Sequence, residues 1–190
     1  WRLKETDTRI LDEALLPTQD HANVSGGSVA AQLMSKQPQP GAKAPSFSAP
    51  AVGGAWTEPA TVSLADLKGE TVVLYFYPKD DTPGCTKQAC ALRDGWQDIS
   101  SKAKVFGVSV DPIKSHVKFI RKHDLPFPIL SDEDHSIVEA YGVWVEKSMY
   151  GRTFMGTERT TFIIGPDGVI KAVLPKVKPD EHLPKVLELL

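Results

Sequence analysis

The sequence predicts an α/β domain with a mixed central β-sheet flanked by helices on both faces. Strand-sized apolar segments alternate with helical ones from residue 42 onward, and strand–helix–strand units build parallel strands covered by helices. Near the C-terminus this order changes. Two strand-like segments, RTTFIIG (159–165) and GVIKAVLP (168–175), flank a Pro-Asp-Gly turn and indicate an antiparallel hairpin, which makes the sheet mixed.

The 190 residues predict one domain and an N-terminal extension, because one domain commonly takes about 100 to 200 residues. Residues 1–40 contain loop-like stretches, HANVSGGS and SKQPQPG, besides a segment, TRILDEALL, with the apolar spacing of a short helix. We expect residues 1–40 to be a partly ordered extension. An interaction or targeting arm is the alternative. Residues 41–190 are expected to form the domain.

The domain is expected to begin with a strand in APSFSAPAV (44–52), followed by a short connection in TVSLADLKG (61–69). TVVLYFY (71–77) is continuously apolar and rich in β-branched and aromatic residues. This pattern is typical of a central strand that is buried on both faces. Pro78 cannot donate a hydrogen bond to a neighbouring strand, so we expect the strand to end there.

Residues 84–99 predict a helix, because their apolar residues recur at spacings of three and four and so share one face. These residues are Ala89, Leu92, Trp96 and Ile99. The next unit is a strand, KVFGVSV (104–110), followed by a helix in which Asp111 and Pro112 fit the N-cap and the first position. The remaining predicted elements are a strand at 126–132, a short helix at 136–143 and a last helix at 179–190.

Composition excludes several classes of protein. The chain is 41% hydrophobic and 24% charged, with a net charge of −2. It therefore lacks the excess of basic residues that would indicate nucleic-acid binding. Its longest apolar runs are far shorter than the roughly 18 residues that span a bilayer, so we expect no membrane segment. Two cysteines are too few for a disulfide scaffold. These thiols either react or are merely buried apolar groups, and the count alone leaves both readings open.

Both cysteines lie in one stretch, YPKDDTPGCTKQACALRD (77–94). Cys85 follows a buried strand and a Pro-Gly turn at the start of a predicted helix, where unpaired backbone N–H groups and the helix dipole favour a thiolate. The nearby Asp80, Asp81 and Asp94 would oppose this thiolate if they were close. A cation supplied from elsewhere in the chain would therefore help Cys85 to react.

Cys90 follows five residues after Cys85, a spacing that constrains how the two thiols can react together. In an ideal helix their Cα atoms are about 8 to 9 Å apart on divergent faces. A disulfide requires Cα atoms within about 7 Å. If the two thiols join, the first turns of the helix must therefore unwind.

The sequence implies no metal and no bound organic cofactor. A C-x-x-x-x-C pair lacks the four ligands of a structural zinc site, and the five histidines are scattered without metal-ligand spacing. The glycines do not have the spacing of a dinucleotide-binding loop.

The stretch around Cys85 resembles a known family. Pro78, Thr82 and Cys85 match the P-x-x-x-T-x-x-C pattern of peroxiredoxins, and FYPKDDTPGCTKQAC is similar to the peroxiredoxin Q branch, also called bacterioferritin comigratory protein. The resemblance extends from about residue 42 to the C-terminus, and residues 1–40 fall outside it. It implies a thioredoxin-like fold and a thiol-dependent peroxidase that reduces hydrogen peroxide and organic hydroperoxides.

The resemblance also implies roles for individual residues. Cys85 is expected to be the peroxidatic cysteine, which attacks the O–O bond and becomes a sulfenic acid. Thr82 is expected to hydrogen bond the thiolate and the peroxide; its other reading is a turn threonine bonded to its own backbone. Pro78 is expected to shield the thiolate, and Arg159 to hold the thiolate and polarise the peroxide. Cys90 matches the position of the resolving cysteine, which forms an intramolecular disulfide with Cys85.

A thioredoxin-like dithiol donor is then expected to reduce the disulfide, because the chain has no C-x-x-C of its own. The resemblance favours a monomer. A thiol cycle suits the cytoplasm, and an exported or organellar form stays open. Two alternatives to the peroxidase remain: a redox sensor that signals through the Cys85–Cys90 disulfide, and a disulfide oxidoreductase, against which the missing C-x-x-C argues. Sustained turnover of peroxide separates the enzyme from the sensor.

Overall fold

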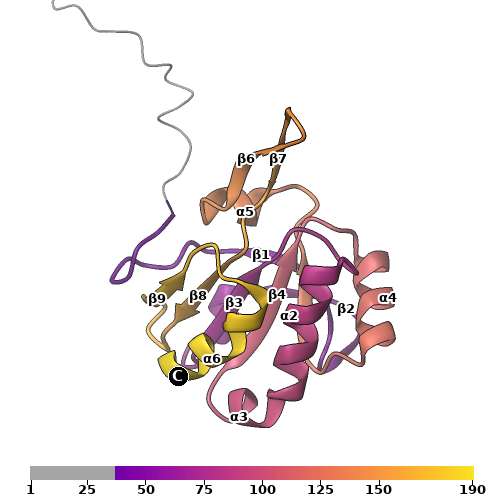
Figure 1. Ribbon diagram of the computed structural model, residues 1–190. Helices are drawn as coiled ribbons and strands as arrows, with labels where there is room; N and C mark the ends of the chain where they lie inside the picture. The colour runs from indigo at the N-terminus through magenta and orange to yellow at the C-terminus, as the bar shows by residue number, and fades with distance from the viewer. Residues whose placement is uncertain (1–36) are drawn as a thin grey trace, which may run out of the picture.

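The computed structural model describes residues 37–190, which are built on a seven-stranded mixed β-sheet (Figure 1). The helix expected near the N-terminus lies outside the described residues. The three central strands run parallel, and every other pairing in the sheet is antiparallel. In spatial order the strands are β2 (Trp56–Ser63), β1 (Ser48–Gly53), β5 (Pro128–Ser131), β4 (Lys104–Ser109), β3 (Val72–Phe76), β8 (Thr160–Ile164) and β9 (Ile170–Leu174).

Helices cover both faces of this sheet, as the sequence predicted. One face carries α2 (Pro83–Asp94), α3 (Trp96–Ser100), α4 (Ile113–His123) and α6 (Pro179–Leu189), and the other carries α5 (Ser136–Ala140) and the 3₁₀ helix η1 (Leu64–Leu67). All five residues of β3 are buried, and they alternate between two hydrophobic clusters. Leu74 packs in the cluster that contains α5, whereas Tyr75 packs in the cluster that contains α2 and α6. The period of two residues in a strand thus divides the core into two layers.

The sequence prediction missed two hairpins. The expected connection at 61–69 is in part the edge strand β2, which has a single buried residue and therefore lacks a hydrophobic pattern. The second hairpin joins β6 (Trp144–Met149) to β7 (Arg152–Thr157) in a separate two-stranded sheet. Its turn residues Tyr150 and Gly151 both have positive φ, as the type I′ turn of a two-residue hairpin requires.

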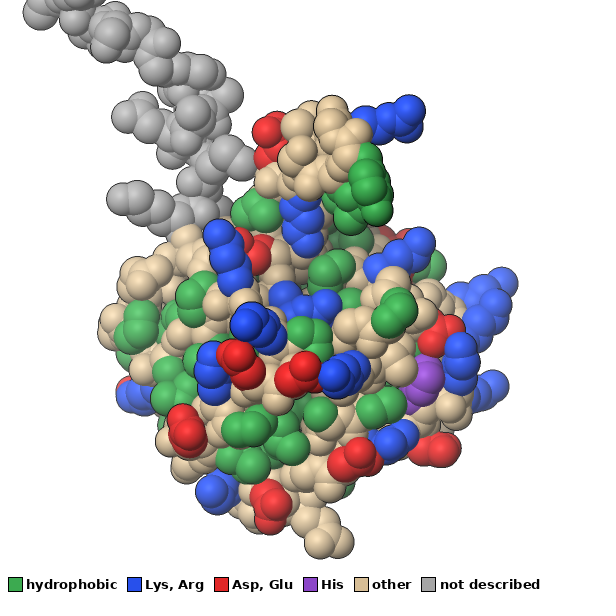
Figure 2. Space-filling model, in the orientation of Figure 1, with side chains coloured by type: hydrophobic (Ala, Val, Ile, Leu, Met, Phe, Trp, Pro, Cys, Tyr) green, Lys and Arg blue, Asp and Glu red, His purple; other side chains and the backbone are tan. Residues whose placement is uncertain are grey.

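The β6–β7 hairpin projects from the body of the domain (Figures 1 and 2). It carries four exposed large hydrophobic side chains: Met149, Tyr150, Phe154 and Met155. Elsewhere on the face shown in Figure 2, positive and negative side chains are mixed. Among the helices of residues 37–190, none has both the length and the apolar composition needed to cross a membrane.

The predicted helix 84–99 is wrong in one respect, because the chain breaks at Gly95 into α2 and α3. A Cβ atom at Gly95 would lie 2.8 Å from two methyl carbons of Leu183 on α6. The close approach of α6 therefore favours a glycine there.

The N-cap of α4 is Pro112 rather than the expected Asp111. The Asp111 carboxylate instead accepts hydrogen bonds from Ser109 Oγ and from the Asp80 N–H.

His182 attaches α6 to the sheet and makes the stability of the fold depend on pH. Its buried ring is hydrogen bonded through Nε2 to Thr161 Oγ1 at 2.8 Å and lies against Tyr75. Burial, assisted by the charge of Arg159, lowers the pKa of His182 from an ordinary 6.5 to about 3. Below pH 6.5 the unfolded chain thus binds a proton that the folded chain does not bind. The free energy of unfolding therefore decreases as the pH decreases.

We expect His182→Gln, which cannot titrate, to remove this acid sensitivity. Between pH 7 and pH 5 the parent should lose about 2 kcal/mol of unfolding free energy through His182, and the variant should not. Denaturant unfolding at the two pH values measures the difference. Equal losses in both proteins would show that His182 titrates normally in the fold.

Candidate active site

The local structure of α2 places Cys85 at a helix N-terminus. Thr82 is the N-cap, Pro83 is the first helical residue, and Cys85 is the third. Pro83 suits this first turn, because its missing N–H group would have no partner there. Cys85 is only 3% exposed and belongs to the hydrophobic cluster that contains Tyr75 of β3 and Val186 of α6. Its sulfur thus lies at the positive end of the helix dipole in a largely dry setting.

Arg159 supplies the cation that the sequence analysis required near Cys85. It directly precedes β8, and its Nη2 donates to Cys85 Sγ at 3.4 Å. Its Nη1 donates to Oε1 of Gln88, which is fully buried one turn further along α2. The guanidinium reaches α2 closely because Gly84 has no side chain: a Cβ atom there would lie 3.3 Å from Nη2. Two donors of one guanidinium thus join β8 to the first turns of α2.

Thr82 and Pro78 lie in the loop between β3 and α2. The Thr82 hydroxyl donates to the carbonyl of Lys79 at 3.0 Å, which is the turn interaction that sequence analysis had set against a catalytic role. No hydrogen bond joins Thr82 to Cys85 in this structure. Pro78 lies two residues after the end of β3 and is half-buried. The catalytic roles expected of Thr82 and Pro78 therefore remain predictions.

The acidic residues near Cys85 are all paired. The buried Asp80 carboxylate accepts hydrogen bonds from the Tyr77 hydroxyl at 2.6 Å and from the Ser115 hydroxyl at 2.7 Å, and it contacts His116 Nδ1 at 2.7 Å. Asp80 thus attaches the loop before α2 to α4. Asp94 pairs with its neighbour Arg93.

Cys90 is half-buried, lies on the same helix as Cys85 and is also a free thiol. Because both residues are within one continuous α-helix, the separation derived from helix geometry applies, and no disulfide joins them. Cys90 Sγ lies 4.0 Å from Nδ1 of His123 at the end of α4. The structure therefore brings Arg159 to Cys85 and a histidine to Cys90.

An open depression of about 460 Å³ borders Arg159. Its other charged lining residues are Glu146, Lys147, Glu158, Lys176 and Lys178. Burial lowers the pKa of Lys147, and the charge of Arg159 lowers it further.

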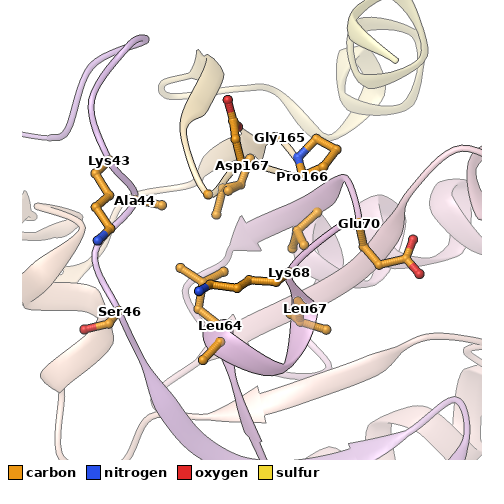
Figure 3. Close-up of a pocket in the computed structure, with 14 residues that line it drawn as sticks. Lys43, Ala44, Ser46, Leu64, Leu67, Lys68, Glu70, Gly165, Pro166 and Asp167 are labelled. Atoms are coloured by element: carbon orange, nitrogen blue, oxygen red, sulfur yellow. The ribbon is translucent and has the colours of Figure 1, made fainter.

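A second hollow, of about 270 Å³, lies between η1, the segment near Lys43 and the turn at Pro166 (Figure 3). Neither cysteine nor Arg159 lines that hollow, so it is separate from the two thiols.

Three residues near the thiols escaped sequence analysis: Gln88, His116 and His123. Gln88 had the appearance of an ordinary helix former between the cysteines. The two histidines lie more than thirty positions from the residues that they contact, at separations of 36 for His116 and Asp80 and 33 for His123 and Cys90. Within residues 37–190, no group of three or more histidine, cysteine or acidic side chains could hold a metal ion.

Comparisons with known proteins agree with this arrangement. Residues 40–173 match the AhpC/TSA family. The chain is 51% identical over 148 residues to a putative peroxiredoxin bcp from Coxiella burnetii, covering 77% of this chain and 95% of that protein. It is 43% identical over 148 residues to peroxiredoxin Bcp from Escherichia coli K12, covering 77% and 92%.

Solved structures of similar proteins superimpose on this chain. The bacterioferritin comigratory protein of Xanthomonas campestris, studied in trapped intermediate and ligand complexes for its alkyl peroxide reduction activity, superimposes with a TM-score of 0.70. The two chains are 33% identical, and the alignment covers 80% of this chain and 94% of that one.

Proposed function

Because the chain belongs to the AhpC/TSA family, among its Bcp or peroxiredoxin Q members, we propose that Cys85 is the peroxidatic cysteine and Cys90 the resolving cysteine. The protein is a thiol-dependent peroxidase with a thioredoxin-like fold. Peroxide is its substrate, and the alkyl peroxide activity of the Xanthomonas campestris relative supports organic hydroperoxides as one class of substrate. The observation that carries the assignment is the contact of 3.4 Å between Cys85 Sγ and Arg159 Nη2.

The first step is attack by the Cys85 thiolate on the terminal oxygen of a hydroperoxide. An S–O bond forms, the O–O bond breaks, and the departing alkoxide takes a proton to leave as alcohol, or as water when the substrate is hydrogen peroxide. Arg159 stabilises the negative charge that moves from sulfur to the departing oxygen, in the way that fixed donors stabilise developing anions in other enzymes. Arg159, which contacts the sulfur, also lines the open depression described above.

The second step joins the two cysteines. Cys90 attacks the sulfur of the Cys85 sulfenic acid, the S–O bond breaks, and the oxygen leaves as water. Because an intact α2 holds the two thiols too far apart, its first turns must open before this step. A thioredoxin-like dithiol donor then reduces the disulfide and returns α2 to its helical form.

Intact-mass measurement after one equivalent of hydrogen peroxide tests this cycle. The reduced protein should lose two hydrogens and both free thiols. Cys90→Ser should instead gain one oxygen, because its sulfenic acid has no internal partner, and it should stop after a single turnover. No change in the mass of the parent would remove both cysteines from the reaction. Oxidation of the parent without repeated turnover in the presence of a dithiol donor would favour the redox sensor.

A single chain contains both cysteines of the proposed disulfide, so no second subunit is required for the cycle. We therefore infer a monomer, which sedimentation equilibrium checks directly through the molecular mass. A cycle that passes through two free thiols suits a reducing compartment such as the cytoplasm. A disulfide in protein taken from unstressed cells would contradict that location.

A further inference from the structure

Cys90, His123 and Asp81 form a chain of contacts that the peroxidase assignment does not explain. Cys90 Sγ lies 4.0 Å from His123 Nδ1, and His123 Nε2 lies 3.0 Å from Asp81 Oδ1. The three residues come from α2, α4 and the loop before α2. The His123 side chain is 17% exposed, so most of its ring is covered by protein.

The surroundings hold the His123 ring in place. Arg93 on α2 donates through Nη1 to the His123 carbonyl at 2.8 Å, which fastens the end of α4 to the second half of α2. Phe119, one turn earlier on α4, packs against the imidazole with ring centroids 5.3 Å apart. Asp81 is held in turn by Lys122, whose Nζ lies 2.6 Å from the second carboxylate oxygen.

Asp81 also determines which nitrogen of His123 faces the thiol as a base. A carboxylate can only accept hydrogen bonds, so Nε2 of His123 carries the proton in this contact. In the neutral ring Nδ1 then has a free lone pair directed at Cys90 Sγ. A nucleophile, a histidine and a carboxylate in this order form the arrangement by which enzymes activate weak nucleophiles.

We propose that His123 is the general base of the resolving step and that Asp81 is its positioning residue. This inference rests on the proposed function, because it assigns His123 a role only if Cys90 resolves the Cys85 sulfenic acid. His123 Nδ1 takes the proton from Cys90 Sγ, and the resulting thiolate attacks Cys85. The imidazolium then gives that proton to the departing hydroxide, so the step releases one water and regenerates neutral His123.

The contact between Cys90 and His123 can persist while α2 opens. Cys85 is in the first turn of α2. The second half of the helix is held by the buried side chains of Ala89 and Leu92 and by the hydrogen bond from Arg93 to α4. Unwinding the first turns therefore moves Cys85 toward Cys90 and leaves the second half of α2 in place. His123 meets the resolving thiol at the position where the disulfide forms.

The reactivity of Cys90 alone gives the first test. In a Cys85→Ser background, the alkylation rate at pH 7 reports on the Cys90 thiolate without any peroxide chemistry. An ordinary thiol with a pKa of about 8.5 is only about 3% ionised at pH 7. A neighbouring base can therefore raise the alkylation rate by at most about thirtyfold. We expect His123→Gln to slow alkylation about tenfold. Lys118→Gln, which removes an exposed cation from the same helix, should leave the rate unchanged.

Asp81→Asn provides a second variant that keeps the shape of the site. Asp81 has a φ of 54°, and asparagine tolerates this left-handed conformation. The amide no longer supplies the negative charge that stabilises an imidazolium, so we expect a slower alkylation here as well. Unchanged alkylation in both folded variants would overturn the proposal.

Single-turnover kinetics of the full chain then separate this inference from the proposed function. Oxidation should depend on the peroxide concentration, and disulfide formation should follow as a step independent of it. We expect His123→Gln to slow only the second step, again about tenfold, and Lys118→Gln to affect neither. Equal rates of the second step with and without His123 would overturn the inference alone. Absence of any sulfenic acid in Cys90→Ser, where it has no internal partner, would overturn the proposed function itself.

Discussion

Cys85→Ser is expected to reduce peroxide consumption to the uncatalysed background while the protein stays folded. Within residues 37–190, the Cys85 sulfur is the nucleophile that Arg159 contacts, and a serine hydroxyl at neutral pH is a far weaker nucleophile than a thiolate. Serine has nearly the same shape as cysteine, so the buried position should tolerate it. Peroxide consumption with excess dithiol donor measures the effect, and circular dichroism and thermal unfolding check the fold.

Cys90→Ser is the matched control for this experiment, since it makes the same chemical change five residues along the same helix. It should oxidise at the rate of the parent in the first turnover and then stop. If Cys85→Ser retained steady turnover and Cys90→Ser lost the initial oxidation, the roles of the two cysteines would be reversed.

Arg159→Ala should produce the second large effect, a loss of about 10²- to 10³-fold in the rate constant for oxidation by peroxide. Removing one fixed donor from a developing negative charge has about this effect in other enzymes. Arg159→Lys keeps the charge but cannot contact Cys85 and Gln88 through two nitrogens in one plane, so we expect an intermediate rate. Stopped-flow measurement of the oxidation step separates these variants.

The arginine variant also affects stability, which the experiment must take into account. Without Arg159, the buried Oε1 of Gln88 loses its partner, at a cost of about 1 to 3 kcal/mol. Denaturant unfolding of each variant shows whether the slower oxidation belongs to a folded protein. Arg121→Ala, at an exposed position of α4, is the control for loss of an arginine charge. An oxidation rate like that of the parent in Arg159→Ala would exclude Arg159 from the reaction.

The proposed cycle requires two forms of the same site, one with α2 intact and one with its first turns open. Cys85 and Gln88 are buried in the closed form, and Asp80 attaches the preceding loop to α4 through Ser115 and His116. Opening the first turns of α2 exposes both buried side chains to water. In the proposed cycle, the closed form reacts with peroxide and the open form makes the disulfide.

The order of elements from β3 to α4 could be predicted from sequence because each depends on neighbouring residues. The continuous apolar run of β3, the Pro-Gly start of α2 and the spacing of Ala89 and Leu92 are local signals of this kind. The position of Cys85 at a helix N-terminus followed from the same signals. Arg159 was named through the family resemblance, because an arginine at the start of a strand carries no local sign of its partner.

The missed features depend on contacts between distant residues. The close packing at Gly95 depends on Leu183 of α6, and the β6–β7 hairpin has too few buried residues to give a hydrophobic pattern. His123 meets Cys90 across 33 positions and Asp81 across 42. Spacing along the chain places residues on one face of one element, whereas a meeting of side chains from three elements depends on how those elements pack. For this reason the cysteine proposed to react with peroxide could be identified in the sequence, whereas the base proposed for its partner required the folded chain.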